Sequence, residues 1–429
     1  MFKIALCLLF LLPLSAHAQV SPGQLDGLAS EVQPQVVEWR RWFHQNPELS
    51  NREFNTAEKV AEILREMGLE PITGIAHTGI IAIIEGGKPG PLVAIRTDMD
   101  GLPVTEQTGL PFASTATDVY NGQDVGVMHA CGHDAHMSML LGAAWVLNSV
   151  KDELAGSVML IFQPAEEGAP AGEKGGASLM LEEGIWVEGK PEAIFGIHVG
   201  ITTPGGQIST RPGPLMAAAD RFTLIVKGKQ SHGARPWDGV DPIVVAAQIV
   251  LGFQTIASRQ VDVTLAPSII SVGRITGGVR NNVIPDRVEM EGTIRTFDEE
   301  MRRDIHLRME RTARAIAEAA GAEVEFELEI GTPSVNNDPE LLARMMPTLQ
   351  RVSGDKPVNM VNPQTVAEDF AIYANETPGV FLFLGNGPPD VDPTTLAGNH
   401  SPYFDTHEPN LEVGVRIFSN LVVDYLQQQ

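Results

Sequence analysis

Met128-His129-Ala130-Cys131-Gly132-His133-Asp134-Ala135-His136 is the segment with the highest density of metal-binding side chains in this chain of 429 residues. Cys131 and His133 are two residues apart, so they project to one side of an extended turn but would diverge on a helix. We therefore expect the pair just before a helix, with Gly132 in the turn and Asp134 as the N-cap. A thiolate and a neutral imidazole suit zinc or another borderline transition ion. The alternative is a buried free cysteine beside a helix-capping histidine.

The cysteine count favours a metal-binding role for Cys131 over a disulfide. The chain has two cysteines, and Cys7 falls in a predicted export signal. Oxidising compartments favour paired cysteines, and Cys131 would have no partner for an intramolecular disulfide. Metal ligation or plain burial therefore explains Cys131 better than a disulfide does.

The export signal is predicted for residues 1–18. Lys3 supplies the positive start, Ile4 to Leu14 is a short apolar run, and Ala16-His17-Ala18 fits the small-x-small cleavage rule. The apolar run is too short to span a bilayer, and we expect no later stretch to reach the ~20 apolar residues that a span needs. The sequence therefore predicts cleavage after Ala18 and, in a Gram-negative cell, a periplasmic protein.

The charge balance bears on partners. The chain has 54 acidic and 30 basic residues, a formal net charge of -24. This charge argues against nucleic acid or an anionic membrane surface as a partner. It says nothing specific about a substrate, because solvated surfaces carry most such charges.

Hydrophobic patterning predicts an α/β protein in which one domain interrupts another. Residues 19–213 and 331–429 alternate short apolar strands with helices, with polar side chains at the strands' carboxyl ends, which indicates a site beyond those ends. Residues 214–330 follow the order β-α-β-β-α-β, typical of a ferredoxin-like unit. The length after cleavage, roughly 400 residues, also fits two domains.

Other polar residues could complete a metal site. Glu166 and Glu167 follow a predicted buried strand and Gln163-Pro164, whereas a surface pair of this kind is usually only solvated. His198 is predicted to end an apolar strand, where a lone histidine is often a hydrogen-bonded core residue. His400, in a loop, is equally ambiguous alone. Two adjacent carboxylates on a turn point in different directions, so one can bind metal while the other contacts a water molecule.

Taken together, these residues resemble the aminoacylase and carboxypeptidase family of two-metal hydrolases, in particular its N-acyl-amino-acid amidohydrolase branch. The motifs that carry the resemblance run across nearly the whole chain after residue 18. They are Arg96-Thr97-Asp98-Met99-Asp100-Gly101-Leu102-Pro103, His129-Ala130-Cys131-Gly132-His133-Asp134, Gln163-Pro164-Ala165-Glu166-Glu167-Gly168, Gly196-Ile197-His198, Gly277-Gly278, Asn282-Val283-Ile284-Pro285 and His400-Ser401-Pro402.

The resemblance implies a fold and a set of roles. The fold would be a mixed-sheet metallohydrolase domain interrupted by a ferredoxin-like dimerisation or lid domain. Glu166 would be the general base, and Asp98 would steady a metal-binding group. The wider family has a ligating histidine at the position where this chain has Arg96. The replacement of that histidine is typical of this branch. The ligands of two divalent ions would be Cys131, His133, Glu167, His198 and His400.

The resemblance also implies roles for the inserted domain. His232 would cross a homodimer interface and stabilise the oxyanion in the partner's site. Asn282 and Arg295 would hold the substrate's carboxylate, for which a guanidinium fork is suited. Without the resemblance, His232 would be interpreted as a loop cap and Arg295 as a solvated strand residue.

The sequence thus predicts an exported, homodimeric amidohydrolase that cleaves N-acyl amino acids or blocked dipeptides. Zn²⁺ or Mn²⁺ would suit the ligands, and Co²⁺ or Ni²⁺ would be tolerated. One alternative is a dipeptidase or carboxypeptidase of the same family. Others are a periplasmic binding protein without turnover and a protein with one closed structural zinc site.

Overall fold

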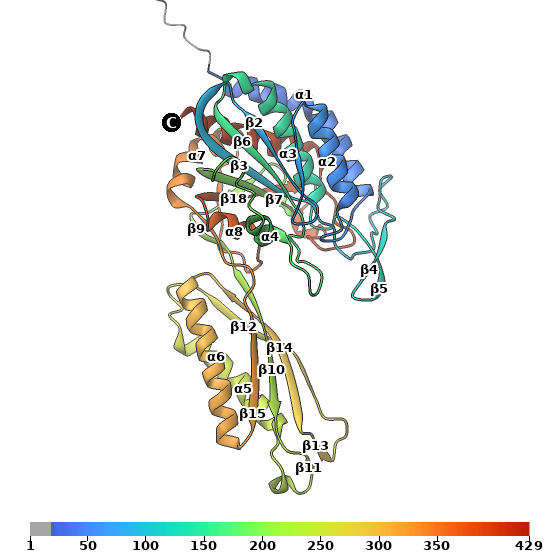
Figure 1. Ribbon diagram of the computed structural model, residues 1–429, viewed down its shortest axis with the longest axis vertical. Helices are drawn as coiled ribbons and strands as arrows, with labels where there is room; N and C mark the ends of the chain where they lie inside the picture. Colours follow the sequence, from blue (N-terminus) through green and yellow to red (C-terminus); the bar gives the residue numbers. More distant parts are fainter. Residues whose placement is uncertain (1–18, 429) are drawn as a thin grey trace, which may run out of the picture.

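The computed structural model describes residues 19–428, so the predicted export signal, residues 1–18, lies outside the described residues. Figure 1 shows two lobes, a larger one built from both ends of the chain and a smaller one inserted between them. The insertion agrees with the interrupted α/β organisation that the sequence predicts. The element order of the smaller lobe is consistent with a ferredoxin-like unit.

Within residues 19–428, a mixed sheet of eight strands forms the centre of the larger domain. In spatial order its strands are β1 (Ile72–Ile75), β2 (Gly79–Glu85), β6 (Ala155–Gln163), β3 (Lys88–Asp98), β7 (Ala193–Pro204), β18 (Gly379–Gly387), β8 (Ile208–Thr210) and β17 (Asn359–Met360). The inner strands β6, β3, β7 and β18 are parallel, and the central residues of each are buried, as expected for a sheet that helices cover on both faces.

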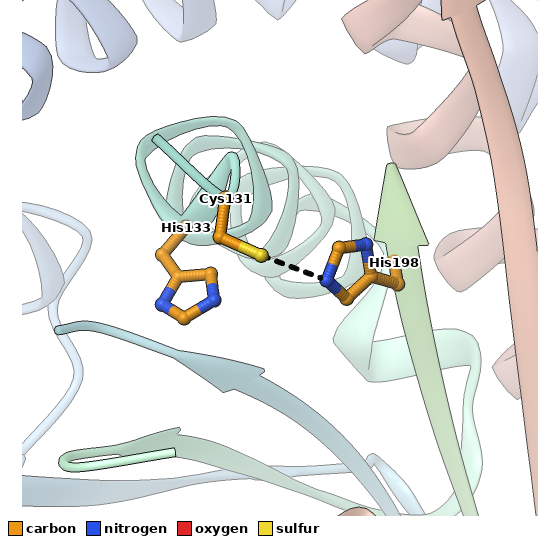
Figure 2. Close-up of side chains that lie close together, drawn as sticks. All are labelled: Cys131, His133 and His198. Carbon is orange, nitrogen blue, oxygen red and sulfur yellow. Dashed lines mark hydrogen bonds between the residues drawn. The ribbon is translucent and has the colours of Figure 1, made fainter. Parts of the chain in front are cut away.

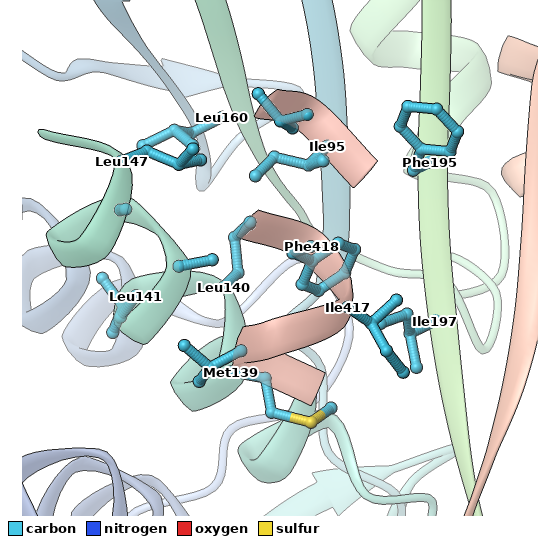
Figure 3. Packing of buried hydrophobic residues seen from close by; sticks show 14 of the residues in the cluster. Ile95, Met139, Leu140, Leu141, Leu147, Leu160, Phe195, Ile197, Ile417 and Phe418 are labelled. Carbon is cyan, nitrogen blue, oxygen red and sulfur yellow. The ribbon is translucent and has the colours of Figure 1, made fainter. Parts of the chain in front are cut away.

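Helices cover the two faces of this sheet unequally. One face carries long helices, namely α1 (Pro22–Gln45), α2 (Phe54–Glu66), α3 (His133–Ser149), α7 (Pro339–Ser353) and α9 (Leu411–Gln427). The other face carries the short helices α4 (Gly176–Glu182) and α8 (Phe370–Ala374). Figure 3 shows Leu140 of α3 and Phe418 of α9 packed against Ile95 and Phe195 of the sheet. A hairpin of β4 (Thr117–Tyr120) and β5 (Gln123–Gly126) projects from this domain.

The smaller domain is an antiparallel sheet with two helices on one face. Its strands, in spatial order, are β12 (Ser268–Gly277), β14 (Arg287–Thr296), β10 (Ala218–Lys227) and β15 (Glu323–Glu329). Its helices are α5 (Pro242–Thr255), continued by one π turn over Ile256–Gln260, and α6 (Glu299–Ala320). The short pair β11 (Ser231–His232) and β13 (Val283–Ile284) lies at the far end of this lobe in Figure 1.

The two chain crossings between the lobes pair with each other as β9 (Gly213–Met216) and β16 (Val335–Asn337). Leu215, Met216 and Val335 are buried with the larger domain's core, whereas Ala217 belongs to the core of the smaller one. The domain bounds at residues 213 and 330 stay predictions.

The expectation that no stretch after the export signal has the length and composition of a membrane span is wrong. In the described part of the chain, the helical stretch Pro242–Gln260 is apolar and long enough to cross a membrane by length and composition alone. Its Val245, Ile249 and Phe253 are buried in the core of the smaller domain. A core helix can therefore have the same composition as a membrane span.

The start of α3 differs from the sequence expectation. His133 is the first residue of the helix rather than a residue before it, and Gly132 occupies the N-cap position with φ 95°. Asp134 is therefore not the N-cap. Its buried carboxylate instead accepts hydrogen bonds of 2.8 Å from Arg40 Nε and from His44 Nδ1 on α1. This contact fixes the start of α3 against another helix.

Substitution of Gly132 by alanine should destabilise the protein by about 2–4 kcal/mol. Gly132 has a positive φ, and a Cβ there would meet Val199 Cγ2 at 2.4 Å. Gly109→Ala is the matched control, because Gly109 also has a positive φ of 75° but no atom lies within 4 Å of its added Cβ. It should cost about 1 kcal/mol. Urea unfolding measures both, and equal losses would contradict the role of the Val199 contact.

Candidate metal centre and interdomain cleft

Cys131 and His198 approach each other at the start of α3. Cys131 Sγ lies 3.3 Å from His198 Nε2, and Figure 2 shows His133 beside them. The Nδ1 of His198 lies 2.8 Å from the carbonyl oxygen of Val199, which fixes the proton on Nδ1. The unprotonated Nε2 therefore faces the thiol. His198 lies within β7 rather than at its end, because the strand continues to Pro204.

Glu167 and His400 complete the cluster from two loops. His400 Nε2 lies 3.1 Å from Glu167 Oε1, and the backbone N–H of His400 donates to the carbonyl oxygen of Ala130 at 2.7 Å. This second bond ties the His400 loop to the residue before Cys131. His400 has a positive φ of 68°, so the surrounding contacts hold it in a strained conformation.

The structure brings the five predicted metal ligands and Glu166 together. Their potential ligand atoms fall into overlapping groups, each within 4.8 Å. These groups are Cys131 with His133 and His198, Cys131 with Glu167 and His400, and His133 with Glu166 and Glu167. Cys131, His133 and Glu167 each belong to two groups, so the side chains surround neighbouring positions rather than a single one.

Asp100, which sequence reasoning missed, joins the two halves of this cluster. Its carboxylate lies 3.2 Å from His133 Nδ1 and accepts the backbone N–H groups of Glu166 and Glu167, each at 3.1 Å. Ser50 donates a further hydrogen bond of 2.7 Å. With Nδ1 of His133 facing Asp100, Nε2 points to the other side, 3.8 Å from Glu166 Oε2.

Asp98 lies behind the cluster. Its Oδ1 is 2.7 Å from His136 Nδ1 but 3.8 Å from His133 Nδ1, so Asp100 is the nearer carboxylate to His133. His136 Nε2 accepts the backbone N–H of Val199 at 2.9 Å. Both nitrogens of His136 therefore have protein partners.

A buried ionic network centred on Arg96 lies next to Glu166. The guanidinium of Arg96 contacts Asp98 at 2.9 Å, Glu368 at 3.0 Å and Asp369 at 2.7 Å. Glu368 and Asp369 also lie within 4.8 Å of Glu166 as potential ligand atoms. Sequence reasoning missed both residues, although an acidic pair directly before the apolar helix α8 is a signal that could have found them.

Burial sets the electrostatics of the cluster. Burial, and then the carboxylates of Glu368 and Glu167, raise the pKa of Glu166 well above its usual range. Burial also lowers the pKa of His198 to about 3, which keeps its imidazole neutral as a metal ligand must be. Burial and the charge of Glu167 raise the pKa of the Cys131 thiol.

The donor set fits divalent cations. Both ring nitrogens of His133 and Oε1 of Glu167 are buried, and the contacts of Nδ1 with Asp100 at 3.2 Å and of Oε1 with His400 at 3.1 Å lack hydrogen-bond geometry. Buried polar atoms are normally satisfied, and exceptions of this kind mark sites for ions or water. A thiol, three imidazoles and a carboxylate around neighbouring positions match the preferences of zinc and similar ions.

The cluster opens into a cleft of about 870 Å³ between the two domains. Cys131, Glu167 and His400 line the larger domain's side, and Arg295 of β14 lines the opposite side. His232 and Asn282 lie elsewhere, on and beside the β11–β13 pair at the far end of the smaller domain. Within one chain, the structure therefore does not bring Asn282 together with Arg295.

Comparisons with known proteins agree with this architecture. The model of peptidase family M20/M25/M40 matches residues 94–424. Thermostable carboxypeptidase 1 of Saccharolobus solfataricus is 40% identical, with 92% of this chain and 96% of the relative covered. N-acetylcysteine deacetylase of Bacillus subtilis is also 40% identical, with 91% and 97% covered.

A solved structure gives the same result. A Bacillus subtilis protein described as a dinuclear metal binding peptidase of the M20 family superposes with a TM-score of 0.77 at 36% identity. The match covers 93% of this chain and 100% of that one. The sequence match, the shared fold and the clustered ligands agree, and the chain belongs to peptidase family M20/M25/M40, as a hydrolase with a candidate metal centre in its interdomain cleft.

Proposed function

We propose that the protein is a metal-dependent amidohydrolase that cleaves the amide bond of N-acyl-L-amino acids or blocked dipeptides. The observation that carries the proposal is the set of overlapping ligand groups around Cys131, His133 and Glu167, with Glu166 beside them. Relatives named N-acetylcysteine deacetylase, N-acyl-L-amino acid amidohydrolase and IAA-amino acid hydrolase support the substrate class. A non-catalytic binding protein would have no need of such a cluster.

Two divalent ions, Zn²⁺ or Mn²⁺, would be held in this centre. The proposed ligands are Cys131, His133, Glu167, His198 and His400. When bound, the ions would polarise the scissile carbonyl and lower the pKa of the attacking water. Co²⁺ or Ni²⁺ would be tolerated by the same donors.

Glu166 would act as the general base. Its carboxylate faces the cleft and lies 3.8 Å from His133 Nε2, on the side of the proposed ligands. A raised pKa suits a residue that must take a proton from water and then give it to the departing amine. Asp100 would fix Glu166 by accepting its backbone N–H, and would fix His133 through the 3.2 Å contact with Nδ1.

A homodimer would complete the site. His232 and Asn282 are remote from the cleft of their own chain, so they would act in the partner's cleft, with His232 as the oxyanion donor. The smaller domain offers a surface for this contact, because β12 is an edge strand of its sheet. Large apolar side chains are exposed nearby, namely Ile243, Val244, Leu251, Val263, Leu265, Ile269 and Ile275.

The compartment would be the periplasm, because residues 1–18 fit an export signal. An exported hydrolase with a lone buried cysteine also agrees with the use of that cysteine as a ligand rather than in a disulfide.

A carboxypeptidase or dipeptidase activity is the second candidate, because a relative at 40% identity is named a thermostable carboxypeptidase. Rates on N-acetyl- and N-benzoyl-amino acids compared with rates on unblocked dipeptides separate the two. Faster cleavage of the unblocked dipeptides would favour the peptidase.

Glu166→Gln should lower kcat by at least about 100-fold, because it removes the proton acceptor. The fold and the metal content should stay unchanged. Glu173→Gln is the matched control, since Glu173 also lines the cleft but contacts Arg52 rather than the cluster. Full activity of Glu166→Gln on N-acyl amino acids would refute the proposed base.

Cys131→Ser should lower the metal-to-protein ratio measured by elemental analysis, because a hydroxyl binds zinc-like ions more weakly than a thiolate does. Ser138→Ala serves as the control, because Ser138 lies in α3, which begins two residues after Cys131, and its hydroxyl donates to the carbonyl oxygen of Asp134. Unchanged metal stoichiometry in Cys131→Ser would count against ligation by the thiol.

A mixture of His232→Ala and Glu166→Gln subunits should regain activity that neither variant has alone. In a mixed dimer, one site would combine an intact Glu166 with an intact His232 from the partner. Activity after co-refolding or subunit exchange measures this complementation. Mixed dimers without recovered activity would show that the sites are not shared.

A further inference from the structure

Two arginines stand next to each other on the cleft wall that the smaller domain provides. In the β10–β14 ladder, Ala219 pairs with Arg295 and Arg221 pairs with Thr293. Arg221 and Arg295 are therefore diagonal neighbours on one face of the sheet, and both line the cleft opposite Glu167 and His400. Residues at diagonal positions lie about 7–8 Å apart, within the combined reach of two arginine side chains.

Neither guanidinium has an ion-pair partner among residues 19–428. Within the described part of the chain, the single polar contact of the Arg295 side chain is with the carbonyl oxygen of Ile294 at 3.4 Å, and the Arg221 side chain makes none. Burial, and then the charge of Arg221, lower the pKa of Arg295. By contrast, the nearby Arg302 is held by Asp220 at 2.5 Å. Two adjacent cations without counter-ions favour an anionic ligand.

One acidic side chain lies next to Arg221. Glu329 of β15 is the cross-strand neighbour of Arg221 and also lines the cleft, yet it makes no ion pair with Arg221. The chain carries a net charge of -24, so two unpaired guanidiniums facing the candidate metal centre stand out from the general surface. They can bind two carboxylates at neighbouring positions.

We propose that Arg221 binds the side-chain carboxylate of an acidic amino acid, so that the preferred substrates are N-acyl derivatives of glutamate or aspartate. This inference rests on the proposed function and on the expectation from the family resemblance that Arg295 holds the substrate's α-carboxylate. Because Arg221 and Arg295 are neighbours, both carboxylates belong to the amino acid that is released rather than to the acyl group. Arg221 is thus a specificity-determining residue.

The test compares isosteric substrates. The metal-loaded wild type should hydrolyse N-acetyl-L-glutamate with a kcat/KM at least about tenfold above that for N-acetyl-L-glutamine. Arg221→Ala should lose this preference while keeping its rate on N-acetyl-L-glutamine within about twofold, and Arg221→Lys should keep part of it. Lys227→Ala is the matched control, because Lys227 lies on the same strand and face but pairs with Glu325 outside the cleft.

The outcomes separate this inference from the proposed function. Turnover of N-acetyl-L-glutamine at the same efficiency as the glutamate compound overturns the role of Arg221 but leaves the amidohydrolase standing. An equal loss of kcat/KM on both substrates in Arg221→Ala likewise overturns the role of Arg221 and leaves the amidohydrolase standing. If no N-acyl amino acid is hydrolysed, the proposed function fails. Calorimetry then decides the role of Arg221, because N-acetyl-L-glutamate should bind wild type at least about tenfold more tightly than Arg221→Ala, and equal binding overturns it.

Discussion

The carboxylate of Asp100 is the contact on which the candidate centre depends. It lies against the ring of His133 on one side and accepts the backbone N–H groups of Glu166 and Glu167 on the other. One buried side chain therefore fixes residues that begin a helix and residues that follow a strand. The geometry between the proposed ligand His133 and the proposed base Glu166 is set by this bridge rather than by either element alone.

Other buried charged side chains also fix the residues around Glu166. Glu53 accepts the backbone N–H of Ala165 at 2.9 Å, which holds the loop before Glu166 in its positive-φ conformation. Arg96 forms ion pairs with the carboxylates of Glu368 and Asp369, which lie close to Glu166. The buried guanidinium of Arg96 keeps together acidic groups that would otherwise repel one another, and its removal would leave buried charges without compensation.

The sequence was sufficient for much of this architecture, because the evidence for it is local. Apolar periodicity defines the strands and helices, and the Cys131 and Glu166 motifs each lie at an element boundary. Asp100, Glu368 and Asp369 were missed because their partners are far away along the chain. Asp134 was misjudged for the same reason, since Arg40 and His44 on another helix compete with the capping role. Apolar periodicity does not fix where a buried strand stops, so it does not predict that β7 continues beyond His198 to Pro204.

The pairing of β9 with β16 brings the two ends of the inserted domain together. Met216 and Val335 are direct cross-strand partners, so their Cα atoms lie about 5 Å apart, a gap that a two-residue turn can close. Among the described residues, the two core clusters of the larger domain draw no member from 217–334. The inserted segment could thus be excised or exchanged at one ladder position, which makes this junction a natural point for grafting a different lid onto the same hydrolytic scaffold.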